Sequence, residues 1–297
     1  SVDPAQREQE ALRLLREAAL QPFDLTRGPL ARLSLLQLDE EEHILLFVLH
    51  HAVGDQWAGG TLVREIAPAY EACVNNRDPG FRPLRIQYAD YAAWQRKHLD
   101  GEVLERQRAY WRGRLTGMSR LELPADHPRT AHASSRGAYL SAPIPAGLHD
   151  SLRQLSITQG ATVFMTMLAA FKLLLARYSG QEDIAIGSPV ANRTHTDTED
   201  LVGTMDDTLV MRSDLSGDPS FVELLRRVRE TALQAYAHQG YPYDLLVEEL
   251  RGQGQGQGQD AALVNVLFNM PNAPGKHLAL QGLSIEPFYF DRGSTLF

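Results

Sequence analysis

"LFVLHHAVGDQWAGG", residues 46–60, is the stretch from which the rest of the chain is interpreted. An apolar run ends in two adjacent histidines, His50 and His51, and Asp55 follows four residues after the second one. Side chains that are neighbours along a strand point to opposite faces, so one imidazole can face a cavity while the other packs inward. The stretch therefore predicts a strand that presents one imidazole to a loop, followed by the start of a helix.

An imidazole titrates near neutral pH, so a rigidly held histidine suits general-base chemistry. A structural or surface pair of histidines explains the same residues without any catalysis. No His, Asp or Glu at helical spacing completes a ligand set with Asp55, so we predict no metal. Asp55 alone is typical of a helix N-cap or an ion-pair partner. A serine hydrolase is disfavoured because the sequence has no G-x-S-x-G turn.

The composition is that of a globular protein. The chain has 297 residues, 43% of them hydrophobic, a formal net charge of −8, and one cysteine, Cys73. Scattered basic residues argue against a nucleic-acid partner. A single cysteine excludes an internal disulfide and favours a reducing, cytoplasmic location. No apolar run approaches the length of a membrane span, and the charged first residues do not form a signal peptide.

Hydrophobic periodicity predicts a mixture of helices and strands. Helices are expected at 4–20, 57–74, 86–99, 104–117, 146–160, 161–180, 220–239 and 241–250. Strands are expected at 31–38, 43–50, 138–145, 183–193, 207–215, 262–270 and 283–290. This mixture indicates α/β or α+β layers.

Two segments without periodicity divide the predicted elements. The polar, proline-containing segment 123–137 is interpreted as a connector between a lobe at 1–122 and a lobe at 138–297. The repeat "GQGQGQGQ", residues 252–259, is predicted to be a flexible loop from its composition.

Five motifs in order along the chain resemble those of condensation domains in nonribosomal peptide synthetases. The first, "HHAVGDQ" at 50–56, resembles the family motif H-H-x-x-x-D-G. The others are "YADYAAW" at 88–94, "IGSPVANR" at 186–193, "VGTMDDTLVMR" at 202–212 and "HQGYPYDLLVEEL" at 238–250. The five matches occur in order between residues 50 and 250, which makes the resemblance specific.

The chain departs from the family pattern at a few positions. Gln56 stands where the first motif ends in glycine, which tolerates a positive φ and leaves space beside the base. Asp207 stands where the family has asparagine, and Tyr243-Asp244 replaces Phe-Glu. Family members run to roughly 450 residues, so the resemblance implies a core fragment that lacks about 100 residues at each end.

The resemblance implies two lobes similar to chloramphenicol acetyltransferase, forming a V around a central tunnel, with both lobes incomplete in this chain. Its reaction is amide formation between a donor acyl or peptidyl thioester and an acceptor aminoacyl thioester. Both are held on phosphopantetheine arms of carrier domains, with an adenylation domain adjacent. The domain itself needs no cofactor, and we expect a monomeric domain of a multidomain chain that binds neither nucleic acid nor membrane.

The resemblance also implies a role for each residue of the first motif. His51 would position or deprotonate the acceptor amine, and His50 would pack and orient the loop. Asp55 would hold the loop by an ion pair, for which Arg193 is one candidate partner. Backbone N–H groups from Gly54 through Gln56 to Trp57 would stabilise the tetrahedral oxyanion.

Related activities share the same base, and three stay open at this point: acylation by a starter domain, epimerisation, and ester formation. A cyclising relative is disfavoured because such domains carry aspartates in place of His50 and His51. A catalytically degenerate domain that recruits other proteins is the non-enzymatic alternative, favoured by Gln56 and disfavoured by the intact histidine pair.

Overall fold

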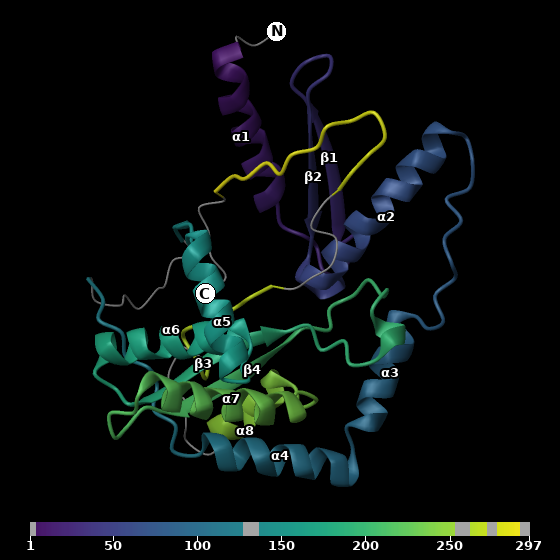
Figure 1. Ribbon diagram of the computed structural model, residues 1–297. Coiled ribbons are helices and arrows are strands. Elements are labelled where there is room, and N and C mark those ends of the chain that lie inside the picture. Colours follow the sequence, from purple (N-terminus) through teal and green to yellow (C-terminus); the bar gives the residue numbers. More distant parts are fainter. Residues whose placement is uncertain (1–3, 127–136, 253–261, 272–277, 292–297) are drawn as a thin grey trace.

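The computed structural model describes residues 4–126, 137–252, 262–271 and 278–291. Its elements form two groups in space, with α1, β1, β2 and α2 at one end and α4 to α8 with β3 and β4 at the other (Figure 1). The helix α3 (Tyr88–His98) lies at the side, between α2 and α4 along the chain (Figure 1). Helices and strands are thus layered together, as expected for an α+β protein.

The first group contains an antiparallel hairpin between two helices. It comprises α1 (Pro4–Leu20), β1 (Ala31–Gln37), β2 (His43–Leu49) and α2 (Gln56–Val74). The strand register pairs Leu33 with Phe47 and Leu35 with Leu45. All four of these side chains are exposed, so one face of the hairpin is apolar and open. The predicted hairpin is confirmed, and its second strand ends one residue before the histidine pair.

The second group holds the larger core. It comprises α4 (Gly101–Leu115), α5 (Ala146–Thr158), α6 (Val163–Ser179), β3 (Asp183–Val190), β4 (Asp207–Asp214), α7 (Phe221–Ala237) and α8 (Tyr243–Gly252). The strands β3 and β4 pair antiparallel in full register, and residues 184–188 of β3 are buried without a break. A strand that is buried on both faces usually has a continuous run of apolar residues. Such a run is the pattern from which β3 was predicted.

Local signals in the sequence account for the ends of the core helices. Ser220 accepts the Glu223 N–H at the start of α7, and Thr162 accepts the Met165 N–H at the start of α6. Gly180 ends α6 in the left-handed conformation, at φ +71°, which costs a glycine little. The predicted positions of both helices are confirmed.

The helix α4 packs with the second group although it precedes the predicted connector. Trp111, Leu115 and Leu121 lie in the same core cluster as the side chains of β3, β4 and α7. The Trp111 indole N–H also donates to the His238 carbonyl at 3.0 Å. The division into lobes at residues 122 and 138 stays a prediction, and residues 127–136 of the connector lie outside the described part of the chain.

A lysine lies inside the larger core. The Lys172 side chain on α6 is fully buried, and its ammonium nitrogen lies 2.7 Å from both the Met211 carbonyl oxygen and Ser213 Oγ. Burial lowers the pKa of Lys172 to about 7 because the charged form loses its hydration. The lysine thereby joins α6 to β4, at a position where hydropathy alone predicts an apolar residue.

Three predicted strands do not form in the described residues. Residues 138–145 are irregular, with Tyr139 and Leu140 exposed. Residues 262–270 make one parallel bridge, at Leu267 to Gly187, and residues 283–290 make one bridge, between Leu283 and Leu280. Periodicity identifies segments that suit a strand, but a strand needs a partner backbone along its length.

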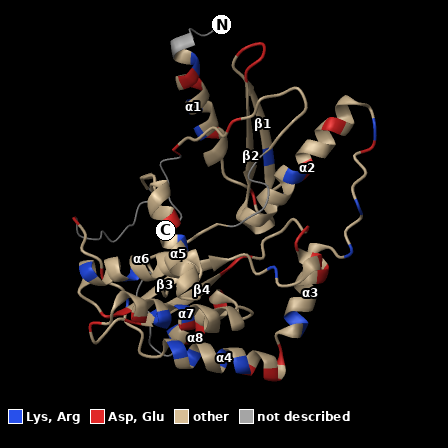
Figure 2. Ribbon diagram, in the orientation of Figure 1, with Lys and Arg blue, Asp and Glu red and all other residues tan. Residues whose placement is uncertain are grey.

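Acidic and basic residues both occur along most of the helices (Figure 2). Among the described residues, no single helix is both long enough and apolar enough to span a membrane, although α5 and α6, bent by 105° at their junction, pass that test as a pair. Cys73 is a free, exposed thiol.

Gly187→Ala is expected to lower the free energy of unfolding by about 1–3 kcal/mol. A Cβ at this position would lie 2.4 Å from Leu267 Cδ2, and 3.0 Å from both Thr208 Cγ2 and Val264 Cγ2. Gly59→Ala in α2 is the matched control, because its Cβ would meet nothing within 4 Å and alanine favours a helix. Urea denaturation of both variants measures the difference, and equal midpoints would contradict this account of β3.

Candidate functional site

The histidine pair lies at the end of β2, where His51 begins a 3₁₀ turn, His51–Val53. The His50 Nδ1 accepts the Ala52 N–H at 3.0 Å, and its ring meets Phe23 edge-on at 5.8 Å between centroids. The His51 side chain instead keeps 57% of its surface exposed. His50 therefore packs and holds the turn while His51 opens outward, which is the divergence that strand alternation predicts.

Gln56 is the first residue of α2 and takes a helical conformation. Among the described residues other than glycine, positive φ values occur only at Asn76, Asn192 and Asp218. Position 56 therefore does not require the positive φ that glycine tolerates. Gly54 is extended, and a Cβ there would lie 3.3 Å from Leu49 Cδ1, so its lack of a side chain permits close packing.

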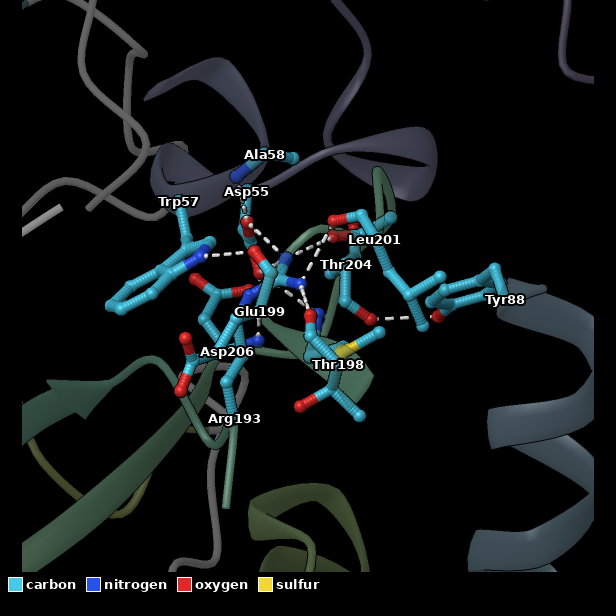
Figure 3. A network of polar contacts seen from close by, with 12 residues as sticks. Asp55, Trp57, Ala58, Tyr88, Arg193, Thr198, Glu199, Leu201, Thr204 and Asp206 are labelled. Atoms are coloured by element: carbon cyan, nitrogen blue, oxygen red, sulfur yellow. Dashed lines mark hydrogen bonds and ion pairs between the residues drawn. The ribbon is translucent and has the colours of Figure 1, made fainter. Parts of the chain in front are cut away.

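Asp55 caps the start of α2 and pairs with Arg193, the partner that the sequence suggested. Its Oδ1 accepts the Ala58 N–H at 2.7 Å. The Arg193 Nη2 lies 3.1 Å from Asp55 Oδ1 and 3.2 Å from Oδ2, and each side chain is only 1% exposed. The pair joins residues 138 positions apart in the sequence (Figure 3).

Backbone groups of the segment 198–206 complete the polar network around this pair (Figure 3). The Arg193 guanidinium donates to three carbonyl oxygens, those of Thr198, Leu201 and Gly203. The Asp55 Oδ2 accepts the N–H groups of Met205 and Asp206 at 3.0 and 3.2 Å. A buried charge is tolerated when most of its hydrogen-bonding capacity is used. The Asp55 carboxylate and the two terminal nitrogens of Arg193 meet that condition, whereas Arg193 Nε is buried without a hydrogen-bond partner among the described residues.

Further contacts attach the same segment to the histidine turn and to α3. The Thr204 hydroxyl donates to the His51 carbonyl, and the Tyr88 hydroxyl donates to the Thr204 carbonyl at 2.7 Å. The Trp57 indole N–H donates to the Glu199 carbonyl at 2.8 Å. A Cβ at Gly203 would lie 2.1 Å from the Tyr88 ring, so only glycine allows this approach.

Two cavities meet beside His51. The smaller, of about 420 Å³, is also lined by Tyr91, Gln95, Asp207, Tyr243 and Asp244. The larger, of about 1180 Å³, is also lined by Gln56, Trp57, Phe164, Met165, Val190 and Met270. Both cavities are lined by His51, Asn192, Asp206 and Thr208. The exposed imidazole thus lies where a polar, acidic cavity adjoins a more apolar one.

Two adjacent carboxylates at this junction have different surroundings. The Asp206 Oδ2 lies 3.6 Å from His51 Nε2, and burial raises the pKa of Asp206 while His51 lowers it. Asp207 accepts the N–H groups of Thr208 and Tyr243, the second of which begins α8. Burial nevertheless raises the pKa of Asp207 to about 6.

The structure brings all seven sequence-predicted site residues to one region, although His50 and Gly54 line neither cavity. Their roles in a reaction stay predictions. Sequence reasoning missed Asp206, Thr204 and Tyr88; the first two lie within the quoted stretch 202–212, and Tyr88 begins the stretch 88–94. An aromatic stripe at helical spacing is typical of a core. In the stripe formed by Tyr88, Tyr91 and Trp94, however, Tyr88 and Trp94 are exposed and only Tyr91 is buried. No cluster of three or more candidate metal ligands occurs within the described ranges.

The family model "Condensation domain" matches residues 2–292, and the chain belongs to this family, the condensation domains of nonribosomal peptide synthetases. It is 51% identical over 288 residues to a linear gramicidin synthase protein of Brevibacillus parabrevis, covering 97% of this chain and 6% of that protein. Malpinin synthetase of Mortierella alpina is 42% identical over 276 residues, which cover 93% of this chain and 4% of that protein. The chain thus spans a small fraction of the length of these relatives.

Solved structures agree with this assignment. The X-domain from teicoplanin biosynthesis is 33% identical, with a TM-score of 0.76 over 82% of this chain and 56% of that one. The first condensation domain of the calcium-dependent antibiotic synthetase has a TM-score of 0.75 at 22% identity, over 93% and 61%, which shows the fold. The predicted fold class is confirmed, and the chain spans somewhat more than half of these solved chains.

Arg193→Ala is expected to lower the free energy of unfolding by about 3–5 kcal/mol, because it leaves the Asp55 carboxylate buried without its cation. Arg64→Ala is the matched control: Arg64 pairs with Asp200 between α2 and the same segment, but both side chains are exposed, so the expected loss is at most about 1 kcal/mol. Chemical denaturation compares the two variants. Equal losses would show that the buried pair contributes no more than a surface pair.

Asp207→Asn is expected to raise the free energy of unfolding by about 1–3 kcal/mol at pH 8 and to change it little at pH 4. Because the pKa of Asp207 rises from 3.8 to about 6 on folding, the folded protein holds this proton more tightly. Stability is therefore lost as the pH rises through that window, and asparagine removes the loss. Denaturation midpoints at both pH values test this, with exposed Asp150→Asn as the control.

Proposed function

We propose that the chain catalyses amide-bond formation between a donor acyl or peptidyl thioester and the amine of an acceptor aminoacyl thioester. The observation that carries the proposal is the exposed His51 imidazole at the junction of two cavities. A condensation reaction needs two tethered substrates to meet at one base, and a site open from two sides suits that requirement.

His51 takes the role of the base in this proposal. Its neutral Nε2 accepts a proton from the acceptor amine, whose nitrogen lone pair forms the new bond to the donor carbonyl carbon. The carbon–sulfur bond then breaks, and the electron pair leaves with the sulfur of the donor arm. Because a thioester is already activated, much of the rate comes from the alignment of the two reactants.

The start of α2 supplies the groups for the oxyanion. The first N–H groups of a helix have no partner within the helix and point outward from its N-terminus. We assign the N–H groups of Gln56 and Trp57 to the tetrahedral oxyanion, since both residues line the larger cavity. Asp55 acts indirectly, because its pairing with Arg193 fixes where this helix begins.

Carrier domains are the proposed partners, each presenting its substrate on a phosphopantetheine arm, with an adenylation domain in the same synthetase. The apolar larger cavity suits the donor acyl or peptidyl group, and the acidic smaller cavity suits the acceptor amine. No resident cofactor enters the proposal. The cytoplasmic location and the monomeric state also stay predictions.

Recruitment of another protein is a second candidate function. The X-domain from teicoplanin biosynthesis, which is 33% identical to this chain, was solved in complex with OxyB. Gln56, in place of the motif glycine, favours this alternative, whereas the exposed His51 favours catalysis. Recruitment without catalysis predicts that no amide forms even with both carriers loaded, and that a partner enzyme still binds.

His51→Ala is expected to lower the rate of amide formation at least about tenfold, equivalent to about 1.4 kcal/mol of activation free energy. The full-length protein that contains the chain is supplied with loaded donor and acceptor carriers, and the dipeptidyl product is followed by mass spectrometry. His149→Ala on the exposed face of α5 is the control. An unchanged rate in His51→Ala removes this residue from the reaction, and incorporation of solvent deuterium without amide formation would instead indicate epimerisation.

A further inference from the structure

Asp206 faces His51 at the junction of the two cavities. Its Oδ2 lies 3.6 Å from His51 Nε2, and both residues line both cavities. Asp206 is the more enclosed of the two, with 31% of its side chain exposed against 57% for His51. The carboxylate therefore lies against the ring nitrogen to which the proposed reaction assigns the proton.

The backbone on both sides fixes this arrangement. The Asp206 N–H donates to the buried Asp55 Oδ2, and the Thr204 hydroxyl donates to the His51 carbonyl. Tyr88 in turn holds the Thr204 carbonyl from α3. The histidine turn and the segment that carries Asp206 are thus fastened to each other by contacts that do not involve the imidazole.

The separation of 3.6 Å distinguishes the two protonation states of His51. It is too long for a hydrogen bond to a neutral ring, but it lies within the range of an ion pair with a protonated one. A carboxylate at this distance favours the charged ring over the neutral ring. The Asp206 carboxylate therefore interacts most strongly with His51 after the ring has accepted a proton, which is the step that a general base performs.

We propose that Asp206 is a positioning residue for His51, which holds the ring toward the cavity junction and stabilises the imidazolium formed when Nε2 takes the acceptor's proton. The inference rests on the proposed condensation reaction. It adds to that reaction a residue that lies outside the H-H-x-x-x-D motif in the sequence but close to it in space.

The proton and electron balance of the step is complete without an added reactant. The acceptor ammonium gives one proton to His51 Nε2, and its nitrogen lone pair forms the C–N bond. The C–S bond breaks, and its electron pair leaves on sulfur. The amide nitrogen then loses a second proton, which neutralises the thiolate, and the proton on His51 returns to water. Asp206 remains ionised throughout and balances the ring's charge while it lasts.

Several of the other charged and titratable groups around the junction have partners of their own. In the described residues that line the two cavities, these other groups are Asp55, Tyr91, Arg193, Asp207, Tyr236, Tyr243 and Asp244. Asp55 and Arg193 neutralise each other, and Asp207 accepts two backbone N–H groups at the start of α8. Asp206 is the carboxylate that contacts the His51 ring.

Asp206→Asn tests the inference in the full-length protein with loaded donor and acceptor carriers. The plateau rate of amide formation is expected to fall about tenfold while the KM values for both loaded carriers change little, because the ring loses the carboxylate that orients it and balances its charge. Asp206→Glu is expected to recover part of the rate. Asp150→Asn, which removes the same charge from an exposed His–Asp pair on α5, is expected to change neither quantity.

A wild-type enzyme that forms amide, with an identical plateau rate in Asp206→Asn, overturns the inference alone. A wild type that forms no amide overturns the proposed function, and with it the catalytic role given to Asp206.

Discussion

The arrangement of this site depends on one buried ion pair, Asp55 with Arg193. Removing two charges from water costs several kcal/mol per ion, so a buried pair by itself is weak evidence for stability. Here much of the cost is offset, because the terminal nitrogens of the guanidinium donate to three carbonyls and the carboxylate accepts three backbone N–H groups. The main structural effect of the pair is therefore to specify where α2 begins relative to the segment 198–206.

The sequence predicted most of the helices and the hairpin of β1 and β2 because their determinants are local. The N-cap Ser220 begins α7 and the C-cap Gly180 ends α6, and each acts within one turn of its helix end. The failures at 138–145, 262–270 and 283–290 have a different origin. Those segments have strand-like patterns, but pairing is decided by a partner backbone elsewhere, and the described residues provide one bridge each for the last two.

The candidate site was predictable to the extent that it is encoded in contiguous residues. Alternation along β2 separates His50 from His51, and the spacing of Asp55 predicts a cap or an ion pair. The identity of Arg193 as its partner came from a second motif, not from geometry. Asp206 gave no such signal: one more acidic residue in an acidic chain is uninformative until the fold places it 3.6 Å from the imidazole.

The positions at which this chain departs from the family motifs now separate into different physical cases. At position 56 the backbone is helical, so glutamine leaves the turn intact and differs from glycine only by its side chain; the residue lines the larger cavity. At position 207 the carboxylate accepts the N–H that begins α8, a contact that an asparagine oxygen also makes, so the added charge brings a burial cost and no new bond. Position 206, which the family motif leaves open, adjoins this departure, and its carboxylate lies 3.6 Å from the His51 ring. The two adjacent acids therefore differ: Asp207 affects folding, whereas Asp206 is assigned a role at His51 in the proposed reaction.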